Sequence, residues 1–445
     1  MNLYSLLQAR TAAQGPVRVG LIGAGKFGSM FLAQVPHSAG LEVSAIADLD
    51  PDRACAACRT VGWHDDHIAS VKFSDDAAVL IDRDDVDVVV EATGSPQAGI
   101  AHARAAIAAH KPVVMVSVEA DVLAGPLLAK EAAAAGVVYS MAYGDQPALI
   151  CELVDWARAC GMKVVAAGKG TKYLPEYHNS TPETVWDYYG LSAEEADAGG
   201  MNAQMFNSFL DGTKSAIEMA AVVNAAGLTA PSAGLSFPPC SADDLPRVLC
   251  PEADGGVLSQ AGTVEVISSL ERDSRVVERD LRWGVFVVFE APTSYTTTCF
   301  REYGLLTDAS GRYAALYRPY HLIGMELNIS ILSAALRGEA TGAATGFRGD
   351  VVANAKRDLA AGELLDGEGG ACVWGKLLPA GESIAIGGLP IGLAHGIELT
   401  NDVAAGQLLT WDDVTICEDD ETYQYRRRME EEFGSHRCTG NIVTP

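Results

Sequence analysis

The sequence predicts an α/β protein of three consecutive domains. Residues 1–145 are expected to form a doubly wound parallel sheet, residues 146–345 an α+β domain, residues 346–418 a small β-rich domain, and residues 419–445 a charged helix and tail. Three observations predict this division. An apolar run ends in a glycine-rich turn, strands alternate with Ala-rich helices up to residue 145, and one short phrase occurs twice near the end.

The glycine-rich turn lies between the apolar residues 17–22 and a helical pattern over residues 29–35. A strand, a tight turn and a helix in this order are typical of a Rossmann domain that binds a dinucleotide. The first glycine permits the turn, the second lets the backbone approach a pyrophosphate, and the third lets the helix pack on the strand. The helix N-terminus then faces the phosphates. The predicted cofactor-binding residues are Gly23, Gly25, Lys26, Phe27, Gly28, Asp48, Arg53, Thr93 and Gly94.

Three of these residues bear on the choice between NAD and NADP. Asp48 ends the second expected strand, where an acid normally holds the ribose hydroxyls, and its carboxylate repels the 2'-phosphate of NADP. Arg53 is near enough in the sequence to reach around Asp48, and Lys26 lies inside the turn. These residues leave the choice of cofactor open.

The alternation of strands and helices lapses after residue 145. We expect a strand over residues 163–167, a helix over residues 203–226, and a long surface loop or lid over residues 229–251, which are rich in Pro, Ser and Gly. An apolar helix is expected over residues 327–336. This mixture predicts a domain for substrate binding and oligomerisation.

The repeated phrase, Asp-x-Ala-Ala-Gly, occupies residues 358–362 and 402–406. Gly-rich turns and a β-leaning stretch over residues 382–389 separate the two copies. The simplest interpretation is a small β-rich domain with internal pseudo-symmetry. Residues 421–433 predict a charged helix before a loose tail.

The composition argues against several functions. A formal net charge of -26 makes nucleic acid a poor partner, because such binding needs surface cations that neutralise phosphates. Neither a signal peptide nor an apolar run long enough to span a bilayer is evident, so we expect a cytoplasmic protein with no membrane partner. The pair Cys55 and Cys58 lies in an Ala-rich segment, which favours helix packing over redox or zinc chemistry.

Three segments carry residues suited to chemistry. The first follows the expected strand 163–167 and holds Lys169, Lys172, Tyr173 and His178. Two amines can clamp a phosphate or a carboxylate, and the phenol or the imidazole can donate a proton. A solvated basic loop is the alternative interpretation.

The second segment holds Asn207, Asp211, Lys214 and Glu218, at steps of four, three and four. On one continuous helix this spacing places all four side chains on one face. Surface salt bridging explains such a stripe equally well, but the apolar flanks indicate a buried cleft. Charges in a cleft need a partner such as a substrate or a metal.

The third segment holds Arg318, Tyr320 and His321, of which Arg318 can grip an anion and His321 can exchange a proton near neutral pH. A structural role for this histidine is the alternative. Asp145 and Gln146 directly follow the last strand of the first domain, where a loop reaches the nicotinamide. Asp145 can also serve as a helix N-cap.

Several of these residues resemble a known family. The segment Gly168-Lys-Gly-Thr-Lys-Tyr-Leu174 resembles the Asn-Gly-Thr-x-Asn-Tyr-Ile signature of homoserine dehydrogenases, and Asp211 and Lys214 resemble the catalytic Asp and Lys of that family. Two features depart from the pattern of that family: Asp211 and Lys214 are only three residues apart, and Lys169 stands where the signature has Asn. Over nearly its whole length the chain more closely resembles the 1-deoxy-D-xylulose 5-phosphate reductoisomerase-like (DRL) group. Its end resembles the SAF, or antifreeze-like, module of sialic acid synthases.

The resemblance implies a Rossmann domain, a central catalytic domain and an SAF-like domain, usually in a homodimer. The activity implied is rearrangement of 1-deoxy-D-xylulose 5-phosphate and its reduction by NADPH to 2-C-methyl-D-erythritol 4-phosphate, a step of isoprenoid biosynthesis. Related sugar phosphates or sugar acids are alternative substrates. NADP is therefore the preferred cofactor, NAD the alternative, and a divalent metal stays open, with Asp145, Asp211, Glu218 and Glu326 as the available oxygen ligands.

This chemistry needs a phosphate clamp, an oxyanion stabiliser and a base. Lys169, Lys172 and Arg318 would form the clamp, and Lys214 with Asp211 or His321 would fill the other roles. The expected catalytic residues are Lys169, Lys172, Asp211, Lys214, Glu218 and His321. The expected substrate-binding residues are Asp145, Gln146, Tyr173, His178, Asn207, Arg318 and Tyr320.

Two other functions are compatible with the same features. One is a simple dehydrogenase of a hydroxy acid or an amino acid, as in the homoserine relatives. The other is a sensor that binds NAD(P) without catalysis, although a sensor need not keep acids and bases that face a cleft.

Overall fold

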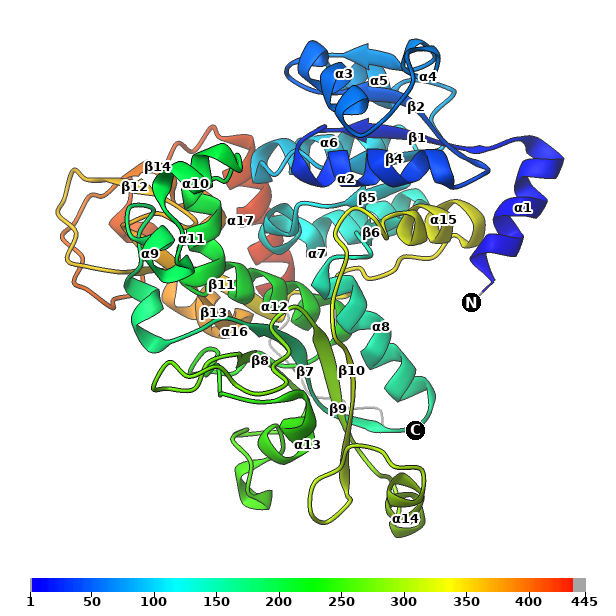
Figure 1. Cartoon of the computed structure of the whole chain (residues 1–445). Coiled ribbons are helices and arrows are strands. Elements are labelled where there is room, and N and C mark those ends of the chain that lie inside the picture. Colours follow the sequence, from blue (N-terminus) through cyan, green and yellow to red (C-terminus); the bar gives the residue numbers. More distant parts are fainter. Residues whose placement is uncertain (1, 435–445) are drawn as a thin grey trace.

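The computed structural model describes residues 2–434, which form three domains packed around helix α12 (Thr213–Ala226) (Figure 1). This helix contacts α7 of the first domain, α8 and β8 of the second, and β11 and β13 of the third. Its middle is apolar on every side, as a helix at the centre of a molecule must be. Groups from all three domains therefore meet near its ends.

The first domain is a parallel sheet of six strands in the order β3-β2-β1-β4-β5-β6. The strands are β1 (Val17–Ile22), β2 (Leu41–Ala47), β3 (Lys72–Ser74), β4 (Val88–Glu91), β5 (Val113–Met115) and β6 (Tyr139–Met141). The helices are α1 (Leu3–Gln14), α2 (Lys26–Gln34), α3 (Pro51–Thr60), α4 (Asp65–Ala69), α5 (Ala77–Ile81), α6 (Pro96–Ala108) and α7 (Val118–Ala135). The predicted doubly wound α/β fold is confirmed.

The two faces of this sheet are covered by different sets of helices. Helices α5, α6 and α7 bury residues such as Ile100 and Leu123 on one face. Helices α1, α2, α3 and α15 (Asn328–Arg337) bury residues such as Phe31 and Ile331 on the other. Because α15 follows the second domain in the sequence, the chain returns to the first domain before it enters the third.

The second domain is a mixed sheet in the order β10-β9-β7-β8, in which only β7 and β8 are parallel. Its strands are β7 (Lys163–Thr171), β8 (Thr263–Ser268), β9 (Val285–Glu290) and β10 (Tyr313–Arg318). Its helices are α8 (Gln146–Ala159), α9 (Val185–Tyr189), α10 (Ala193–Ala198), α11 (Ala203–Leu210), α12, α13 (Leu245–Val248) and α14 (Ser294–Glu302). Helices α8 and α12 pack on the sheet.

Three expectations for this domain are wrong in detail. Strand β7 does not end at residue 167 but continues through Gly168 and Gly170 to Thr171. Both positions need glycine, because a Cβ atom would lie 1.8 Å from the Glu265 carbonyl oxygen at Gly168 and 2.0 Å from the Leu281 carbonyl oxygen at Gly170. The helix expected over residues 203–226 is broken at Gly212, whose φ is 90°. Residues 229–251 are not a surface loop, because their apolar side chains, such as Phe237 and Leu245, are buried.

The third domain contains two antiparallel strand pairs, β11 with β13 and β12 with β14. The strands are β11 (Gly349–Ala355), β12 (Leu364–Asp366), β13 (Val373–Pro379) and β14 (His395–Glu398). The β-leaning stretch expected over residues 382–389 is instead largely helix α16 (Ala380–Ile386), whose end is set by Gly387 in the left-handed conformation.

The two copies of the repeated phrase pair with each other in this domain. Leu359 and Val403 exchange two backbone hydrogen bonds of 2.9 Å. The Asp402 carboxylate accepts from the Ala361 amide, and the Asp358 carboxylate accepts from the Ala405 amide, both at 2.9 Å. The same contact is made twice in opposite directions, so the predicted pseudo-symmetry of the small β-rich domain is present.

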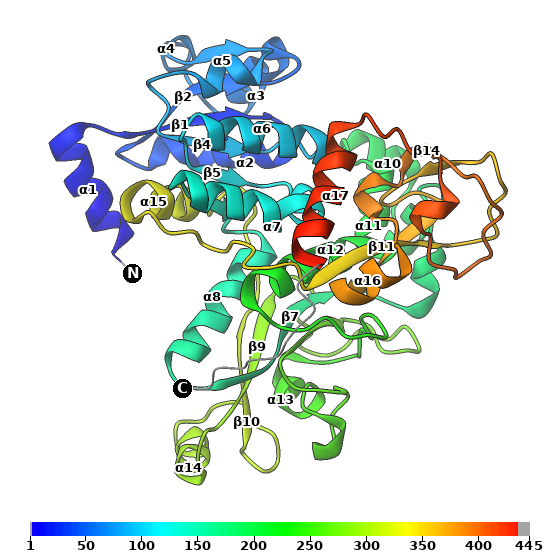
Figure 2. The ribbon, with the colours of Figure 1, turned by 180° about the vertical axis from the view of Figure 1, so that it is seen from behind.

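Helix α17 (Glu421–Gly434), predicted as a charged helix, lies between the first and third domains (Figure 2). It contacts α7 and α16. Arg426 is fully buried and donates to the carboxylates of Asp350 (2.6 Å) and Glu430 (2.8 Å). The predicted tail beyond residue 434 lies outside the described residues.

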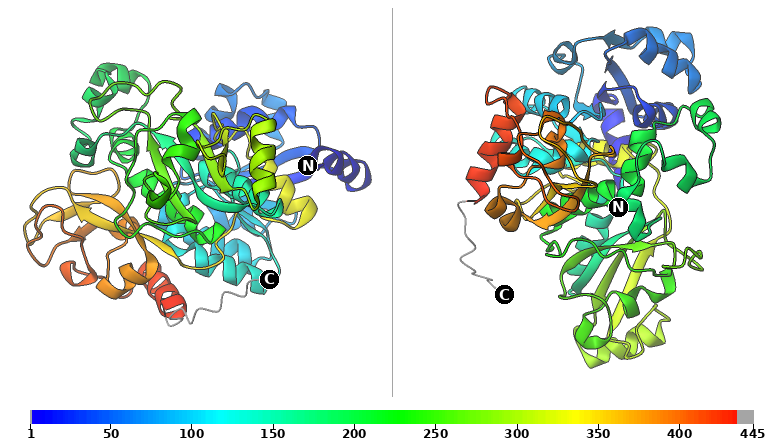
Figure 3. Two further views of the ribbon diagram at one scale, coloured as in Figure 1. Left: turned by 90° about the horizontal axis from the view of Figure 1, so that it is seen from below. Right: turned by 90° about the vertical axis from the view of Figure 1, so that its left-hand side faces the viewer.

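Figure 3 shows from two further sides that the third domain lies beside the junction of the other two. This placement brings loops of the third domain next to α11 and α12. None of the helices between residues 2 and 434 has the length and apolar character that crossing a membrane requires.

Candidate functional site

The glycine-rich turn has the geometry that a dinucleotide requires. A Cβ atom on Gly23, whose φ is 94°, would lie 2.6 Å from the Ala92 carbonyl oxygen, and one on Gly28 would lie 2.4 Å from the Gly23 oxygen. A Cβ atom on Gly25 would meet nothing within 4 Å, so the backbone there is open to a ligand. Lys26 and Phe27 form the first turn of α2, whose free amides point to the same place. These residues fit a bound pyrophosphate.

Asp48 stands at the end of β2, beside this turn, and is only 8% exposed. It accepts hydrogen bonds from the amides of Ala24 (2.9 Å) and Asp50 (3.1 Å) and from the Arg53 guanidinium (2.6 Å). Burial alone would raise the pKa of Asp48, but these donors lower it, so the group is a carboxylate. Thr93 and Gly94 follow β4 at the same edge of the sheet. All the residues predicted to bind the cofactor lie at or near this edge.

A lysine and a carboxylate join the first domain to the second at this edge. Lys214, in the first turn of α12, pairs with Glu119, in the first turn of α7 just after β5. The two side chains are 17% and 16% exposed. Burial would lower the pKa of Lys214, but the surrounding carboxylates, Glu119 first, raise it, so this amine is an ammonium.

Three further residues belong to the same cluster. Lys169 of β7 pairs with Glu218, one turn beyond Lys214 on α12, and both are nearly buried. Asp145 caps α8 by accepting from the Gln146 amide at 2.8 Å. Burial and the Glu218 carboxylate raise the pKa of Asp145, while Lys214 and His321 oppose that rise. Asp145 is therefore a partly exposed carboxyl group near Lys214, and its carboxylate is a stronger base than that of an ordinary aspartate.

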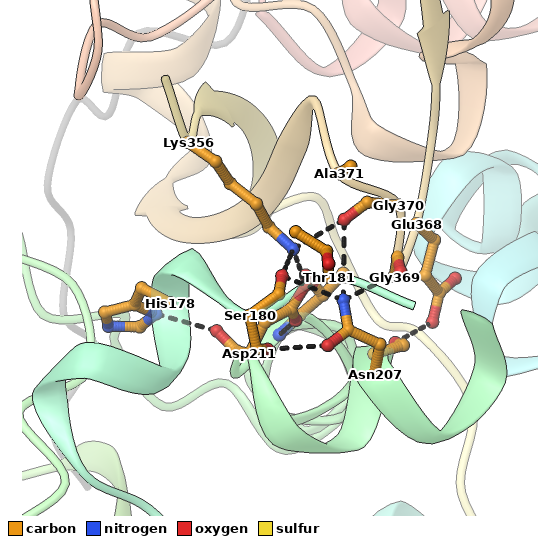
Figure 4. Close-up of polar contacts among 12 residues, drawn as sticks. His178, Ser180, Thr181, Asn207, Asp211, Lys356, Glu368, Gly369, Gly370 and Ala371 are labelled. Atoms are coloured by element: carbon orange, nitrogen blue, oxygen red, sulfur yellow. Dashed lines mark hydrogen bonds and ion pairs between the residues drawn. The ribbon is translucent and has the colours of Figure 1, made fainter. Parts of the chain in front are cut away.

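The predicted stripe on one helix divides into two parts at Gly212. Lys214 and Glu218 belong to the cluster just described, whereas Asn207 and Asp211 are fully buried and contact Ser180 and Lys356 (Figure 4). The Asp211 carboxylate accepts from the Lys356 ammonium of the third domain (2.7 Å) and from the Thr213 amide (2.8 Å). The direct catalytic role expected for Asp211 and the substrate contact expected for Asn207 do not fit this geometry, because neither side chain is exposed.

His178 and Tyr173 form a hydrogen-bonded pair, in which Tyr173 is buried and His178 is half-buried. The Tyr173 hydroxyl lies 2.9 Å from His178 Nε2, and His178 Nδ1 lies 2.7 Å from the Asp211 carbonyl oxygen. A carbonyl only accepts, so Nδ1 carries the proton and Nε2 accepts from the hydroxyl. Burial lowers the pKa of His178 to about 4, and its ring stacks on Trp374 at 3.9 Å. His178 thus packs against Trp374 of the third domain and Tyr173 against Phe237 of its own domain, and the substrate contact expected for these two residues stays a prediction.

The expected phosphate clamp of three cations is not assembled. Lys169 pairs with Glu218, Lys172 donates to the Tyr188 carbonyl, and Arg318 pairs with Glu326. His321 Nδ1 lies 2.7 Å from the Trp283 carbonyl oxygen, and Tyr320, which stacks beside Arg318, is exposed. These two residues are on the loop between β10 and α15, whose Gly324 lies against the first turn of α2.

A metal site does not emerge from the described residues. Within residues 2–434, no three His, Cys, Asp or Glu side chains are grouped so that they can hold a metal ion. Asp211 is paired with Lys356, Glu218 with Lys169, and Glu326 with Arg318. The oxygen ligands named from the sequence therefore do not fit a divalent metal.

Glu119, Lys356 and Glu368 lie at the site but were not among the residues predicted from the sequence. Glu119 had a usable signal, because it directly follows a parallel strand, where ligands bind in α/β sheets. Glu368 stands among Gly367, Gly369 and Gly370 in the loop between β12 and β13. Its place near Lys214 depends on how the third domain packs, which local patterns do not reveal.

Three family models match consecutive parts of the chain. A model of an oxidoreductase family with an NAD-binding Rossmann fold (GFO/IDH/MocA) matches residues 17–119, the catalytic domain of oxidoreductase DRL matches residues 144–327, and the SAF domain matches residues 350–415. The resemblances to DRL and to SAF are confirmed for these residues. The chain is thus similar, in order, to an NAD-binding oxidoreductase domain, to the catalytic domain of oxidoreductase DRL and to an SAF domain. No curated protein matches it.

Several solved structures are similar to parts of the chain. Myo-inositol dehydrogenase from Lactobacillus casei is 21% identical, with a TM-score of 0.29 over 38% of this chain and 50% of that one. Biliverdin reductase from Synechocystis sp. PCC 6803 is 20% identical, with a TM-score of 0.27 over 36% and 48%. A probable dehydrogenase from Thermotoga maritima is 17% identical, with a TM-score of 0.36 over 73% and 90%. The chain thus spans about half the length of the first two proteins.

Proposed function

We propose that this protein is an NADPH-dependent reductoisomerase that acts on 1-deoxy-D-xylulose 5-phosphate or a closely related sugar phosphate or sugar acid. The observation that carries the proposal is the ammonium of Lys214, held among carboxylates at the edge of the sheet that bears the glycine-rich turn. Such a fixed cation can bind a carbonyl or alkoxide oxygen and stabilise negative charge that develops on it. The DRL catalytic domain over residues 144–327 supports the same reaction class.

The roles of the groups follow from their surroundings. Lys214 binds the reacting oxygen, and Asp145, a stronger base than a free carboxylate, takes the hydroxyl proton whose loss starts the rearrangement. The paired Lys169 and Glu218 hold their side of the site rigid. A bound NADPH supplies the hydride for the reduction. No step uses a metal, because the described carboxylates do not form a metal site.

An anionic substrate is supported by two other cations. Lys172 lies three residues beyond Lys169, and Arg282 lies beside Gly170 on the neighbouring chain segment. Burial, and after it the charge of Arg282, lowers the pKa of Lys172. Lys172 donates to the Tyr188 carbonyl and Arg282 lies over the Trp283 ring, and among residues 2–434 neither forms an ion pair with a carboxylate, although the chain carries a net charge of -26. Two cations without a carboxylate partner can bind a phosphate or a carboxylate of the substrate.

The proposal is tested by mixing the protein, NADPH and 1-deoxy-D-xylulose 5-phosphate. Loss of absorbance at the nicotinamide band together with formation of the branched polyol phosphate, followed by NMR, is the expected result. Oxidation of a hydroxy or amino acid without rearrangement would favour the simple dehydrogenase. Cofactor binding with no turnover of a polyol panel would favour the sensor.

Arg53 is expected to determine the preference for NADPH over NADH. Its guanidinium lies 2.6 Å from Asp48 and its side chain is 64% exposed, so it offsets the carboxylate and can reach a 2'-phosphate. Arg53→Ala should weaken NADPH binding about tenfold, the size of one charge-assisted contact, and leave NADH binding nearly unchanged. Fluorescence titration of both cofactors measures this. Arg59→Ala, on the same helix, is the control, and an equal loss for both cofactors would contradict the assignment.

A further inference from the structure

The loop of residues 366–371 in the SAF domain is fastened to the second domain at several points (Figure 4). Gln204 Nε2 donates to the carbonyl oxygens of Asp366 (2.8 Å) and Glu368 (2.9 Å). Asn207 Nδ2 donates to the Gly369 oxygen at 2.8 Å, and Lys356 Nζ donates to the Gly370 oxygen at 2.6 Å. Four acceptors of one short loop are thus occupied by buried or half-buried donors.

The fit of this loop leaves no room for side chains on one side. A Cβ atom on Gly369 would lie 2.0 Å from the Gln204 carbonyl oxygen. A Cβ atom on Gly370 would lie 2.2 Å from the Asp366 carboxylate, which itself accepts from the Cys372 amide at 3.0 Å. The glycines permit this close approach, and the direction of the Glu368 side chain is fixed as a result.

Glu368 joins the acid and base cluster from the third domain. Its Oε1 accepts from the Ser208 hydroxyl of α11, while Oε2 makes no hydrogen bond within residues 2–434 and the side chain is only half-buried. The charged groups that act on it are Glu119 from α7, Lys214 from α12 and Asp211 from the end of α11. Burial, and then the Glu119 carboxylate, raises the pKa of Glu368 to about 8. At neutral pH this carboxyl group therefore retains a proton that it can donate.

We propose that Glu368 is a catalytic residue, contributed by the SAF domain, that gives the substrate oxygen its proton in the reduction step. The inference rests on the proposed function. The carbonyl carbon of the substrate takes up the hydride of NADPH, the electron pair of the C=O π bond moves to oxygen, and the Glu368 proton completes the hydroxyl. The substrate is reduced, NADPH is oxidised, and Glu368 is left as a carboxylate near Lys214 until water reprotonates it. Asp211 and Lys356 are then positioning residues that hold the loop.

The test compares Glu368→Gln with Glu363→Gln, a control on the same domain whose carboxylate pairs with Arg357 at the surface. Glu368→Gln should lower kcat by about 10²-fold to 10⁴-fold, the usual contribution of a general acid, and leave the Kd for NADPH unchanged. In the wild-type protein kcat should fall as pH rises through about 8, and the residual activity of Glu368→Gln should lack this decline. Glu363→Gln should match the wild type. A wild-type kcat and pH profile in Glu368→Gln would overturn the proposal.

A second measurement needs no substrate and separates the two proposals. In protein labelled with ¹³C-glutamate, one carboxyl resonance should titrate with a midpoint near pH 8 and be missing from Glu368→Gln. If the wild type turns over no substrate, the proposed function fails and this titration alone decides about Glu368. A resonance of that kind supports the assignment, and its absence from the wild type overturns it.

Discussion

Replacing Lys214 by alanine is expected to reduce turnover by about 10²-fold to 10³-fold and to leave cofactor affinity nearly intact, because the variant loses the ammonium on which Glu119, Asp145, Glu218 and Glu368 all act. The loss should appear in kcat more than in KM, since the charge on the reacting oxygen is largest in the transition state. Steady-state kinetics with NADPH, and fluorescence titration of NADPH alone, measure the two effects.

Lys163→Ala is the matched control for this prediction. Lys163 is also on an element of the second domain, but its side chain is 68% exposed and pairs with Glu290 at the far end of β7. Its removal should alter neither kcat nor the Kd for NADPH. If Lys214→Ala lost turnover and cofactor affinity equally, the lysine would support the fold or the cofactor and not the reaction.

Replacing Lys356 by methionine is expected to lower the free energy of unfolding by about 3–5 kcal/mol, the usual cost of removing one member of a buried ion pair. The Lys356 ammonium donates to Asp211 Oδ2 (2.7 Å) and to the carbonyl oxygens of Ser180 (2.7 Å) and Gly370 (2.6 Å). Both charged side chains are almost completely buried. The methionine would leave the Asp211 carboxylate without a cation. Urea titration followed by tryptophan fluorescence measures the loss.

The neighbouring Arg357→Met variant controls for the change of side chain. Arg357 is 49% exposed and pairs with Glu363 at the surface, so its loss should cost at most about 1 kcal/mol. The double variant Lys356→Met with Asp211→Asn should recover part of the stability, because it no longer buries an unpaired carboxylate. Equal stability of Lys356→Met and the wild type would mean that this pair does not hold the domains together.

The first domain was predictable because its signals are local. The apolar run, the spacing of Gly23, Gly25 and Gly28, and Asp48 at the end of the next strand all lie within about fifty residues. The structure places them as the pattern indicates. The repeated phrase was equally informative, since Asp358 and Asp402 make the same contact in opposite directions.

The candidate site around Lys214 was only partly predictable because it is assembled from all three domains. Lys214 and Glu218 were found from their spacing, but the helix that gave the spacing ends at Gly212, and Asp211 turns inward to Lys356. The sequence Asp211-Gly-Thr213 is compatible with a break in the helix as well as with a continuing helix. Glu119 and Glu368 reach Lys214 only through packing between domains, which periodicity within one segment does not encode.

The position of α17 has a consequence for biosynthesis. Its Arg426 closes a contact between Leu123 of the first domain and Asp350 of the third, and both of those surfaces leave the ribosome well before the helix does. Until α17 is synthesised, the Asp350 carboxylate lacks its guanidinium partner, and the apolar side chains of α7 that pack on α17 are uncovered. Nascent chains stalled ahead of residue 421 should therefore recruit chaperones and be cut by proteases more readily than chains released with this helix in place.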